Sequence, residues 1–532
     1  MPLSRRSILA GGAAATLAAG IPGFAHAQAT PKRGGTLVAT WGGFEPQALF
    51  VPPGGGTSPF FTSTKPLERL LALDQQLKWQ PVLAQRVEPA ADFRSFTVHL
   101  RRGVTWHDGK NFTAEDVVFS AMQYWKPLSV GVALNALTAT RALDSHTVRF
   151  EFDRPVPEFF FNSVLAGQGG LVIPKHIYET GNIVTNPINN TPIGTGPWKY
   201  KEWVRGSHVE YVRNDNYWEN NKPYLDRLFI RWWRDPASRL AAFESNALDL
   251  GCFNPVPMPE VDRLVRSGRF AADSRGYESS AWCSTIEFNV RKAPFDNRLV
   301  RQALMHAIDR QLVVDTVFFK RGRPGLNPIL SANKLFHTGD VPKYDFNPAK
   351  AAQMLDAAGL RKGRNGRFSV NLLAAGWFEE NGKIGQIVQQ GLEDVDVKVN
   401  LSVPDRPTSL KRIYTDYDYD IALSNYTAPI EAVPVISQYY VSDGIAKGVA
   451  FRNANGFHTP AMDDLVARLT VETDPAKRTA LAHEFGRQAA TEVPFLPLVE
   501  FDSLTVARSD VKNISTGSNW MGETWADLWL DR

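Results

Sequence analysis

Cysteine is almost absent from this chain, and the sequence patterns of several enzyme classes are missing. Only Cys252 and Cys283 occur among 532 residues, and neither lies near a histidine cluster. A metal site is therefore not expected. The chain contains neither the Gly-x-Ser-x-Gly pattern of a nucleophile elbow nor the Gly-x-x-x-x-Gly-Lys pattern of a phosphate-binding loop. We expect no metal ion and no cofactor.

A strong excess of one charge is also lacking. The chain has 59 basic and 55 acidic residues, which gives a formal net charge of +4. Such a balance argues against nucleic acid as a partner, because nucleic-acid binding needs a concentrated positive surface. Beyond the first residues, no stretch is apolar for long enough to span a membrane. The composition is typical of a globular protein.

The first residues have the order of an export signal. Arg5 and Arg6 precede a short run rich in alanine and glycine, and small residues flank His26 at a cleavage point. We expect a twin-arginine signal peptide at 1–27 and export to the periplasm. An uncleaved membrane anchor is the alternative. Cleavage would remove two positive charges and no negative ones, so the net charge would fall from +4 to +2.

Export would place the two cysteines in an oxidising compartment, where they could pair. A bond between Cys252 and Cys283 would close a loop of about 30 residues and stabilise the fold by roughly 3–4 kcal/mol. Two free, buried thiols are the alternative, and the sequence does not decide between them.

The chain is too long for a single hydrophobic core, so we expect two or three domains. The alternation of polar and apolar residues over 282–288 predicts a strand, which Pro294 ends. Asp296 or Asn297 then starts a helix with one apolar face. We expect this segment to form one of the hinges by which two lobes close around a small solute.

Other elements follow from periodicity and turn residues. We expect strands at 36–41, 96–100, 248–253, 368–375, 396–403 and 419–424, and helices from Thr113 and at 234–246, 383–392, 408–414, 462–469 and 477–490. Residues 141–186 are expected to form strands and loops, and 493–499 a return crossing between the lobes. The alternation of strands and helices after residue 368 predicts an α/β lobe.

One turn contains residues that an enzyme could use. His107 and Asp108 lie in a glycine-containing turn and would fit a secreted hydrolase. A purely structural turn is the alternative, and it accounts for both residues.

Four blocks, in order along the chain, resemble the family-5 extracellular solute-binding proteins of ABC importers. This family includes dipeptide, oligopeptide, nickel and opine binders. The blocks are 84–117 with Gly103-Val104-Thr105-Trp106-His107-Asp108-Gly109, 193–226 with Ile193-Gly194-Thr195-Gly196-Pro197-Trp198, 289–304 with Ala293-Pro294-Phe295-Asp296, and the pair formed by Asp463-Asp464-Leu465 and 494–498.

The resemblance implies an α/β fold of two lobes, the type II periplasmic-binding-protein fold with the extra subdomain of the peptide-binding branch. Lobe I would comprise 30–66, 187–285 and 495–532, the extra subdomain 67–186, and lobe II 286–494. Two crossings between the lobes would permit hinge closure over a buried ligand.

The resemblance also indicates where a ligand would lie. In peptide-binding members an acidic residue of lobe II meets the ligand's ammonium group, and the matching position here is Asn425. An ammonium buried there would lack the carboxylate that offsets its desolvation. Dipeptide binders tend to offer a basic group after the strand that here ends at Ala375, but Trp377 and Phe378 follow in this chain. We expect a more aromatic and less cationic cleft.

The candidate ligand-binding residues share a position at an expected strand end, loop or hinge. They are Trp41, Gly42, Gly43, Thr57, Trp282, Trp377, Phe378, Asn425 and Tyr426. For each tryptophan, packing inside a core is the alternative interpretation. Aromatic faces suit sugar rings, aromatic acids and apolar side chains alike, so they do not identify the ligand.

We interpret the chain as an exported receptor rather than an enzyme. It would capture a small solute, such as a peptide, an opine or a sugar conjugate, and deliver it to the membrane subunits of an ABC permease. We expect a monomer. A secreted hydrolase, and a periplasmic chaperone or sensory receptor on the same scaffold, are the alternatives.

Overall fold

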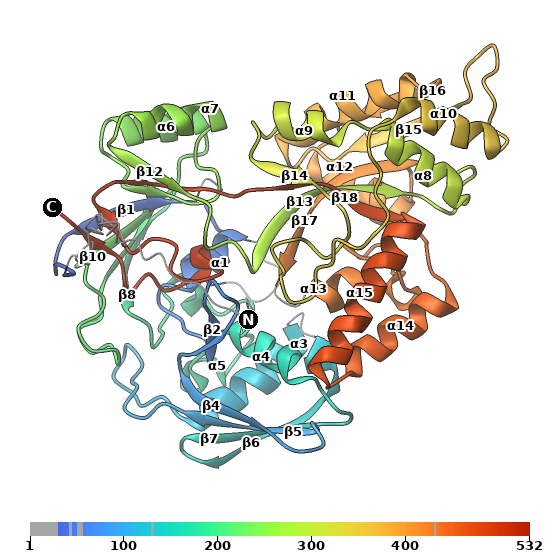
Figure 1. Cartoon of the computed structure of the whole chain (residues 1–532). Coiled ribbons are helices and arrows are strands. Elements are labelled where there is room, and N and C mark those ends of the chain that lie inside the picture. The colour runs from blue at the N-terminus through green and yellow to red at the C-terminus, as the bar shows by residue number, and fades with distance from the viewer. Residues whose placement is uncertain (1–29, 42–44, 51–56, 129–131, 168, 430–431) are drawn as a thin grey trace, which may run out of the picture.

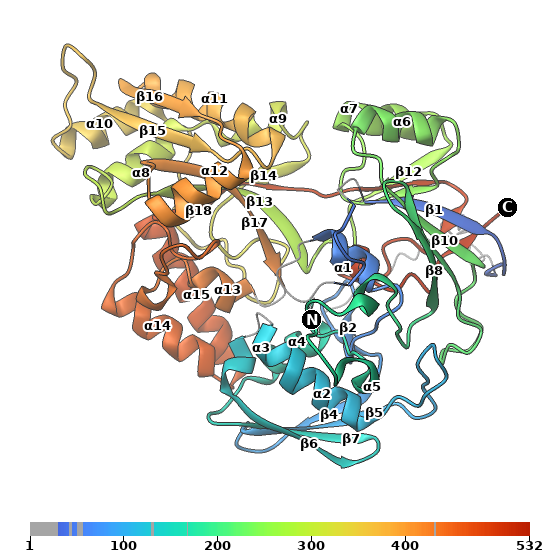
Figure 2. The same cartoon turned by 180° about the vertical axis from the view of Figure 1, so that it is seen from behind.

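Two lobes and a smaller unit make up the protein (Figure 1 and Figure 2). The computed structural model describes residues 30–41, 45–50, 57–128, 132–167, 169–429 and 432–532. The expected signal peptide and the candidate residues Gly42 and Gly43 lie outside the described residues. The three larger sheets have seven, six and four strands. Among the described residues, no helix has both the length and the hydropathy that crossing a membrane requires.

Lobe I is built on the seven-stranded sheet, in the order β12-β19-β11-β1-β10-β9-β8. In that order the strands are Phe270–Asp273, Thr505–Arg508, Leu250–Gly251, Thr36–Thr40, Arg227–Arg231, His208–Arg213 and Trp198–Val204. Strand β1 pairs parallel with β10 and β11, and the other pairs are antiparallel. Helices α6 (Pro236–Glu244) and α7 (Met258–Arg266) cover one face of this sheet (Figure 1). Helix α1 (Thr57–Ser63) and the short pair β20 (Val511–Lys512) and β21 (Trp529–Leu530) complete the lobe.

Lobe II is built on the six-stranded sheet, in the order β14-β18-β13-β17-β15-β16. In that order the strands are Gly322–Pro324, Phe495–Phe501, Ser280–Phe288, Ile421–Pro429, Phe368–Ala374 and Val397–Ser402. Helices α8 (Arg298–Ala307), α9 (Arg310–Thr316), α10 (Pro348–Ala357) and α11 (Glu379–Glu393) lie on one side of it, and α13 (Ala432–Ser437), α14 (Pro460–Val471) and α15 (Pro475–Glu492) on the other (Figure 1). Helix α12 (Arg406–Leu410) continues into a π-helical turn at Lys411–Asp416. The expected strand and helix order of this lobe is confirmed.

The helix expected after Pro294 begins where its capping residue predicts. Asn297 is the N-cap of α8, and its side chain accepts a hydrogen bond of 2.9 Å from the backbone N–H of Leu299. Val300, Ala303 and Leu304 are buried on the inner face. This packing explains the apolar spacing of the sequence.

The smaller unit has the four-stranded antiparallel sheet β4-β5-β7-β6. Its strands are Ala84–Pro89, Ser95–Leu100, Thr147–Phe152 and Leu137–Asp144, in that order, and the hairpin β2 (Leu71–Leu73) and β3 (Trp79–Pro81) lies beside it. Helix α2 (Ala114–Phe119) begins after Thr113, as expected, with a capping box between Thr113 and Asp116, and continues as a π-helix (Ser120–Trp125) and α3 (Lys126–Leu128). Helix α5 spans Lys175–Tyr178.

Helix α4 (Glu158–Ala166) corrects the sequence expectation for 141–186, which named only strands and loops. Seven of its nine residues are buried, from Phe160 to Ala166. A helix surrounded by apolar neighbours has no polar face, so the alternation by which amphipathic helices are recognised is absent.

The chain passes between the lobes twice, through 274–279 and 502–504, in segments that join the two large sheets. Strands β13 and β18 pair with each other and lie wholly in the sheet of lobe II. The expected lobe boundary at 285 falls inside β13, and the one at 495 falls at the first residue of β18. The expected hinge at 282–297 and the expected return crossing at 493–499 therefore lie inside lobe II, and the crossings are the short segments next to β13 and β18.

Lobe II contacts both other parts of the molecule. Arg321, after α9, forms an ion pair with Asp262 of α7 in lobe I. On the other side, Phe159 of α4 meets Phe336 of lobe II edge to face, with ring centroids 5.1 Å apart. The guanidinium of Arg478 lies 5.8 Å from the ring centre of Phe159. These contacts hold the three parts together around the crossings.

The two cysteines are not bonded. Cys252 belongs to the core of lobe I and Cys283 to the core of lobe II, and both are free and fully buried. The structure therefore favours the free-thiol alternative over the disulfide.

Candidate functional site

Strand β13 places Trp282 where the two lobes meet. The indole lies between two other aromatic rings. Phe253 of lobe I is 4.9 Å away between ring centroids, and Phe378 of lobe II is stacked on it at 5.6 Å with an angle of 27°. Each such ring pair stabilises by about 0.5–1.5 kcal/mol beyond the area it buries. Trp282 thus touches both lobes at once.

A chain of amide hydrogen bonds lies beside this aromatic stack. Asn425 on β17 is directly opposite Ser284 on β13 in the sheet register. Its Oδ1 accepts a 2.8 Å hydrogen bond from Nδ2 of Asn381, and its own Nδ2 donates to Oγ of Ser284 over 3.4 Å. Asn381 comes from the first turn of α11, just after Phe378. Strands and helix therefore converge on one polar spot.

We call Trp282, Ser284, Phe378, Asn381 and Asn425 the amide–aromatic cluster. None of the five side chains is ionisable at physiological pH. Asn381 is completely buried, and Asn425 retains 9% of its surface. Oδ1 of Asn381 is buried without a hydrogen-bond partner among the described residues. The cluster offers aromatic walls and neutral hydrogen-bonding groups, with no charge of its own.

Tyr426 follows Asn425 in sequence but lies on the opposite face of the sheet, since successive strand residues alternate. It belongs to the core beneath α13, α14 and α15, with its ring 6.2 Å from that of Tyr439. Its hydroxyl is buried with no hydrogen-bond partner among the residues that the structure describes, and burial raises its pKa. The structure therefore separates Tyr426 from the amide–aromatic cluster.

A buried acid lies further along that second face. Glu287 on β13 is 2% exposed, and desolvation raises its pKa from 4.5 to about 8. Its Oε1 and the hydroxyl of Tyr419 are near each other, but neither has a partner in good hydrogen-bond geometry. The carboxyl group is thus protonated at neutral pH.

The other candidate residues are dispersed. Trp377 packs against Phe451, with ring centroids 6.2 Å apart, in a small core of lobe II that does not include Trp282. Trp41 follows β1 in lobe I, its ring lies 6.4 Å from that of Phe61, and its buried Nε1 has no hydrogen-bond partner within the described ranges. Thr57 is the first residue of α1. Of the nine candidates, the structure brings together Trp282, Phe378 and Asn425.

The turn at His107 is structural. Nε2 of His107 lies 2.9 Å from the carbonyl oxygen of Gly196, and Nδ1 accepts the backbone N–H of Gly194 over 3.3 Å. This pairing fixes the neutral ring, and burial lowers its pKa to about 4. Asp108 instead bonds His176 over 2.8 Å. With both ring nitrogens committed to backbone groups, His107 has no free position for acid–base chemistry.

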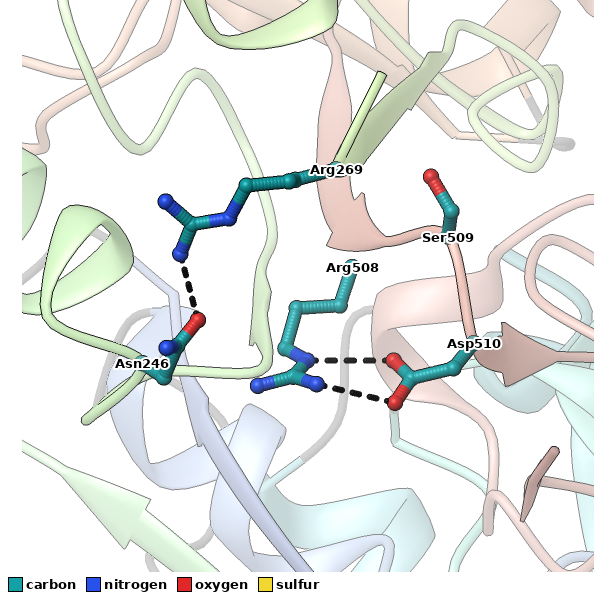
Figure 3. A pocket seen from close by; sticks show the side chains of 5 residues that line it. All are labelled: Asn246, Arg269, Arg508, Ser509 and Asp510. Atoms are coloured by element: carbon teal, nitrogen blue, oxygen red, sulfur yellow. Dashed lines mark hydrogen bonds and ion pairs between the residues drawn. The ribbon is translucent and has the colours of Figure 1, made fainter. Parts of the chain in front are cut away.

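A shallow hollow on lobe I offers charged groups but shares no residue with the cluster. It measures about 220 Å³ and is lined by Asn246, Arg269, Arg508, Ser509 and Asp510 (Figure 3). Arg508 and Asp510 form two hydrogen bonds with each other, of 3.1 and 3.0 Å, and Arg269 donates to the side chain of Asn246. Because these groups satisfy one another, the hollow is a weaker candidate than the cluster.

Three contacts of the site are not apparent in the sequence-based list. Ser284 could have been included, because it lies two residues from Trp282 and therefore on the same face of β13. Asn381 carries no sequence pattern that marks it. Phe253 reaches the site from the other lobe, so only the tertiary fold reveals it.

Comparisons with known proteins agree with one another. The family model described as "Bacterial extracellular solute-binding proteins, family 5 Middle" matches residues 78–447. The heme-binding protein A of Haemophilus influenzae is 28% identical over 384 residues, covering 67% of each chain. The dipeptide-binding protein of Escherichia coli K12 is 29% identical over 319 residues, which cover 55% of this chain and 57% of that protein.

A solved structure shows the same fold. The binding protein AgaA of A. tumefaciens R10, in complex with agropinic acid, superposes with a TM-score of 0.77 at 22% identity and covers 94% of this chain and 99% of its own. Within the described residues, histidine, cysteine and acidic side chains form no group of three or more that could hold a metal ion.

Proposed function

The chain belongs to the bacterial extracellular solute-binding proteins of family 5, and from this premise we propose that its solute binds at the amide–aromatic cluster. Members of this family are the solute-binding proteins of ABC importers and not enzymes, and the chain has the two-lobed fold of that family. The receptor captures a small solute and delivers it to a membrane permease. The hydrolase alternative loses its support with the structural role of His107.

The position of Trp282 is the observation that carries the location of the site. Its ring contacts Phe253 of lobe I and Phe378 of lobe II, so any movement of the lobes about the crossings changes its surroundings. Hinge closure excludes water from such a junction, and each hydrogen bond made there then contributes more than it does in water.

The sheet pairing supports an assignment of the lobes. We assign 30–66, 187–279 and 502–532 to lobe I, 67–186 to the extra subdomain and 280–501 to lobe II. The pairing of β13 with β18 and β17 supports placing the two lobe boundaries at 279–280 and 501–502, outside these strands, in place of the sequence-based 285–286 and 494–495. The crossings at 274–279 and 502–504 then act as the hinges.

The solute is a peptide-like or other small organic compound. The dipeptide-binding relative supports a peptide-like solute, and the neutral, aromatic character of the cluster favours modified peptides, opines or sugar conjugates. Planar rings and sugar faces both pack well against Trp282 and Phe378.

The receptor acts as a monomer in the periplasm, exported by the twin-arginine route. The pair Arg5 and Arg6 supports this route. Replacing both by lysine should leave uncleaved precursor in the cytoplasm. A mature protein that still reaches the periplasm in normal amount would contradict the route.

Native mass spectrometry and small-angle scattering test the function. Protein purified without denaturation should carry a co-purifying solute, and returning that solute to the emptied protein should reduce the radius of gyration. The variant Trp282→Ala should weaken binding by at least about 30-fold, as for a central binding residue. Trp203→Ala, on β8 at the edge of the lobe I sheet, is the matched control and should bind normally. Equal affinities for both variants would overturn the proposed site.

A further inference from the structure

The hydrogen bonds of Asn381 fix the orientation of Asn425. Nδ2 of Asn381 donates both to the carbonyl oxygen of Ala375 and to Oδ1 of Asn425, each over 2.8 Å. A backbone carbonyl only accepts, so the nitrogen of Asn381 must face Ala375. That nitrogen then requires an acceptor from Asn425, which is Oδ1. The backbone carbonyl of Ala375 therefore determines which ends of the two side-chain amides are nitrogen and which are oxygen.

This orientation directs the nitrogen of Asn425 away from Asn381. Nδ2 of Asn425 makes one long contact of 3.4 Å with Oγ of Ser284. A primary amide carries two N–H donors, so donor capacity remains. Ser284 and Asn425 are 1% and 9% exposed, so a solute group that reaches them leaves water behind. The spot beside Trp282 presents hydrogen-bond donors from β13 and β17.

One acceptor complements these donors. Oδ1 of Asn381 is fully buried and unpartnered in the described structure. An unsatisfied buried oxygen is costly, and a ligand donor would remove that cost. The cluster thus offers donors and one acceptor, all neutral.

We propose that the relay Ala375–Asn381–Asn425–Ser284 selects solutes whose recognised end is a neutral group with both a donor and an acceptor, such as an acylated amine, an amide or a hydroxyl, and discriminates against a free ammonium. This inference rests on the proposed binding site. Asn425 and Ser284 donate to the solute, Oδ1 of Asn381 accepts from it, and Nδ2 of Asn381 holds Asn425 in position. An ammonium at this spot would be desolvated without a counter-charge, whereas an amide pairs with the groups present.

A matched pair of dipeptides tests the proposal by isothermal titration calorimetry. The probes are alanyl-phenylalanine and N-acetyl-alanyl-phenylalanine. Wild type should bind the acetylated compound at least about tenfold more tightly. Asn425→Asp should reverse the preference, because it restores an anionic acceptor. Equal or tighter binding of the free amine by wild type would overturn the proposal.

Asn381→Leu tests the positioning role without adding a charge. Leucine cannot donate to Asn425, so Oδ1 of Asn425 loses the partner that holds it and can turn towards the solute. The acetyl-to-amine preference should then shrink or reverse, although residue 425 is unchanged. A merely structural role would lower both affinities alike and leave their ratio intact, which would contradict the relay.

If neither dipeptide binds, the co-purifying solute decides. The proposal is overturned if the solute carries a primary ammonium and wild type retains it while Asn425→Asp loses it. A neutral or blocked solute that wild type retains and Asn425→Asp loses would support the proposal. If the emptied protein takes up none of the dipeptides and no solute co-purifies, the proposed function fails together with this inference. Binding with a preference for the free amine contradicts the relay alone.

Discussion

The two faces of the six-stranded sheet use neighbouring residues in opposite ways. On the face towards α11, Ser284 and Asn425 hydrogen-bond across the strands beside Trp282. On the face towards α13–α15, Thr285 and Tyr426 occupy the next positions, and both hydroxyl groups are buried without a partner in the part of the chain that the structure describes. One residue along each strand separates a connected polar network from isolated polar atoms.

The two faces differ in how much their buried polar groups lower the stability of the fold. An isolated buried hydroxyl costs about 1–3 kcal/mol relative to an apolar group of the same shape. On the second face, the hydroxyl groups of Thr285 and Tyr426 are buried and have no hydrogen-bond partner among the described residues. The amide–aromatic cluster instead satisfies most of its groups and leaves one acceptor open. We expect substitutions on the second face to change stability alone, and substitutions on the cluster to change solute binding as well.

Glu287→Gln should have the largest effect, and the effect should depend on pH. The unfolded carboxyl group ionises near its ordinary pKa of 4.5, whereas in the folded protein it stays protonated up to about 8. Unfolding therefore releases a proton between these values, so wild-type stability falls as the pH rises from 4.5 to 8 and then levels. Glutamine does not titrate, so the stability of the variant does not fall over this pH range for this reason. Each pKa unit corresponds to about 1.4 kcal/mol, which sets an upper limit on the order of 5 kcal/mol.

Chemical denaturation at pH 5 and pH 9 checks this expectation. The variant and wild type should be close at pH 5, and the variant should be clearly more stable at pH 9. The groups that face Glu287 are retained in both proteins: Arg291, Tyr414, Tyr419, Tyr439, Tyr440 and Asn455. A stability difference that stays constant across this range would show that Glu287 is ionised in the folded protein.

Much of the fold follows from sequence patterns, and the reason lies in the strands themselves. The alternation over 282–288 predicts β13, and the capping side chain of Asn297 predicts the start of α8. The same alternation implies that Asn425 and Tyr426 face opposite sides of the sheet, so only one of the two could line the site. Helix α4 escapes prediction because it is buried nearly all round.

The site itself could be predicted only in part. Trp282, Phe378 and Asn425 stand out by residue type and by their place near strand ends. Asn381 does not, because its role depends on a single backbone carbonyl that tertiary structure brings within 2.8 Å. Phe253 lies nearly thirty positions before Trp282 and in the other lobe, so periodicity gives no sign of their contact.

Thr285→Val and Ser284→Ala should shift stability in opposite directions. Valine has the shape of threonine without the unpartnered Oγ1, so Thr285→Val should stabilise the protein by about 1 kcal/mol. Ser284→Ala removes the one hydrogen-bond partner that Nδ2 of Asn425 has among the described residues, and it should destabilise by a similar amount, about 1 kcal/mol. Urea unfolding of both variants measures the two changes. The contrast between the faces breaks down if both substitutions destabilise equally.

Tyr426→Phe should have the smallest effect and is the strictest test of which face meets the solute. The variant loses a hydroxyl that has no partner, while its ring keeps the contact with Tyr439, so stability should rise by less than about 1 kcal/mol. Solute affinity should stay within about twofold of wild type, whereas Asn425→Ala should lower it by at least about tenfold. Calorimetry with the co-purifying solute compares the two. A tenfold loss in Tyr426→Phe would mean that the solute reaches the face beneath α13, and the binding site would then have to include both sides of β17.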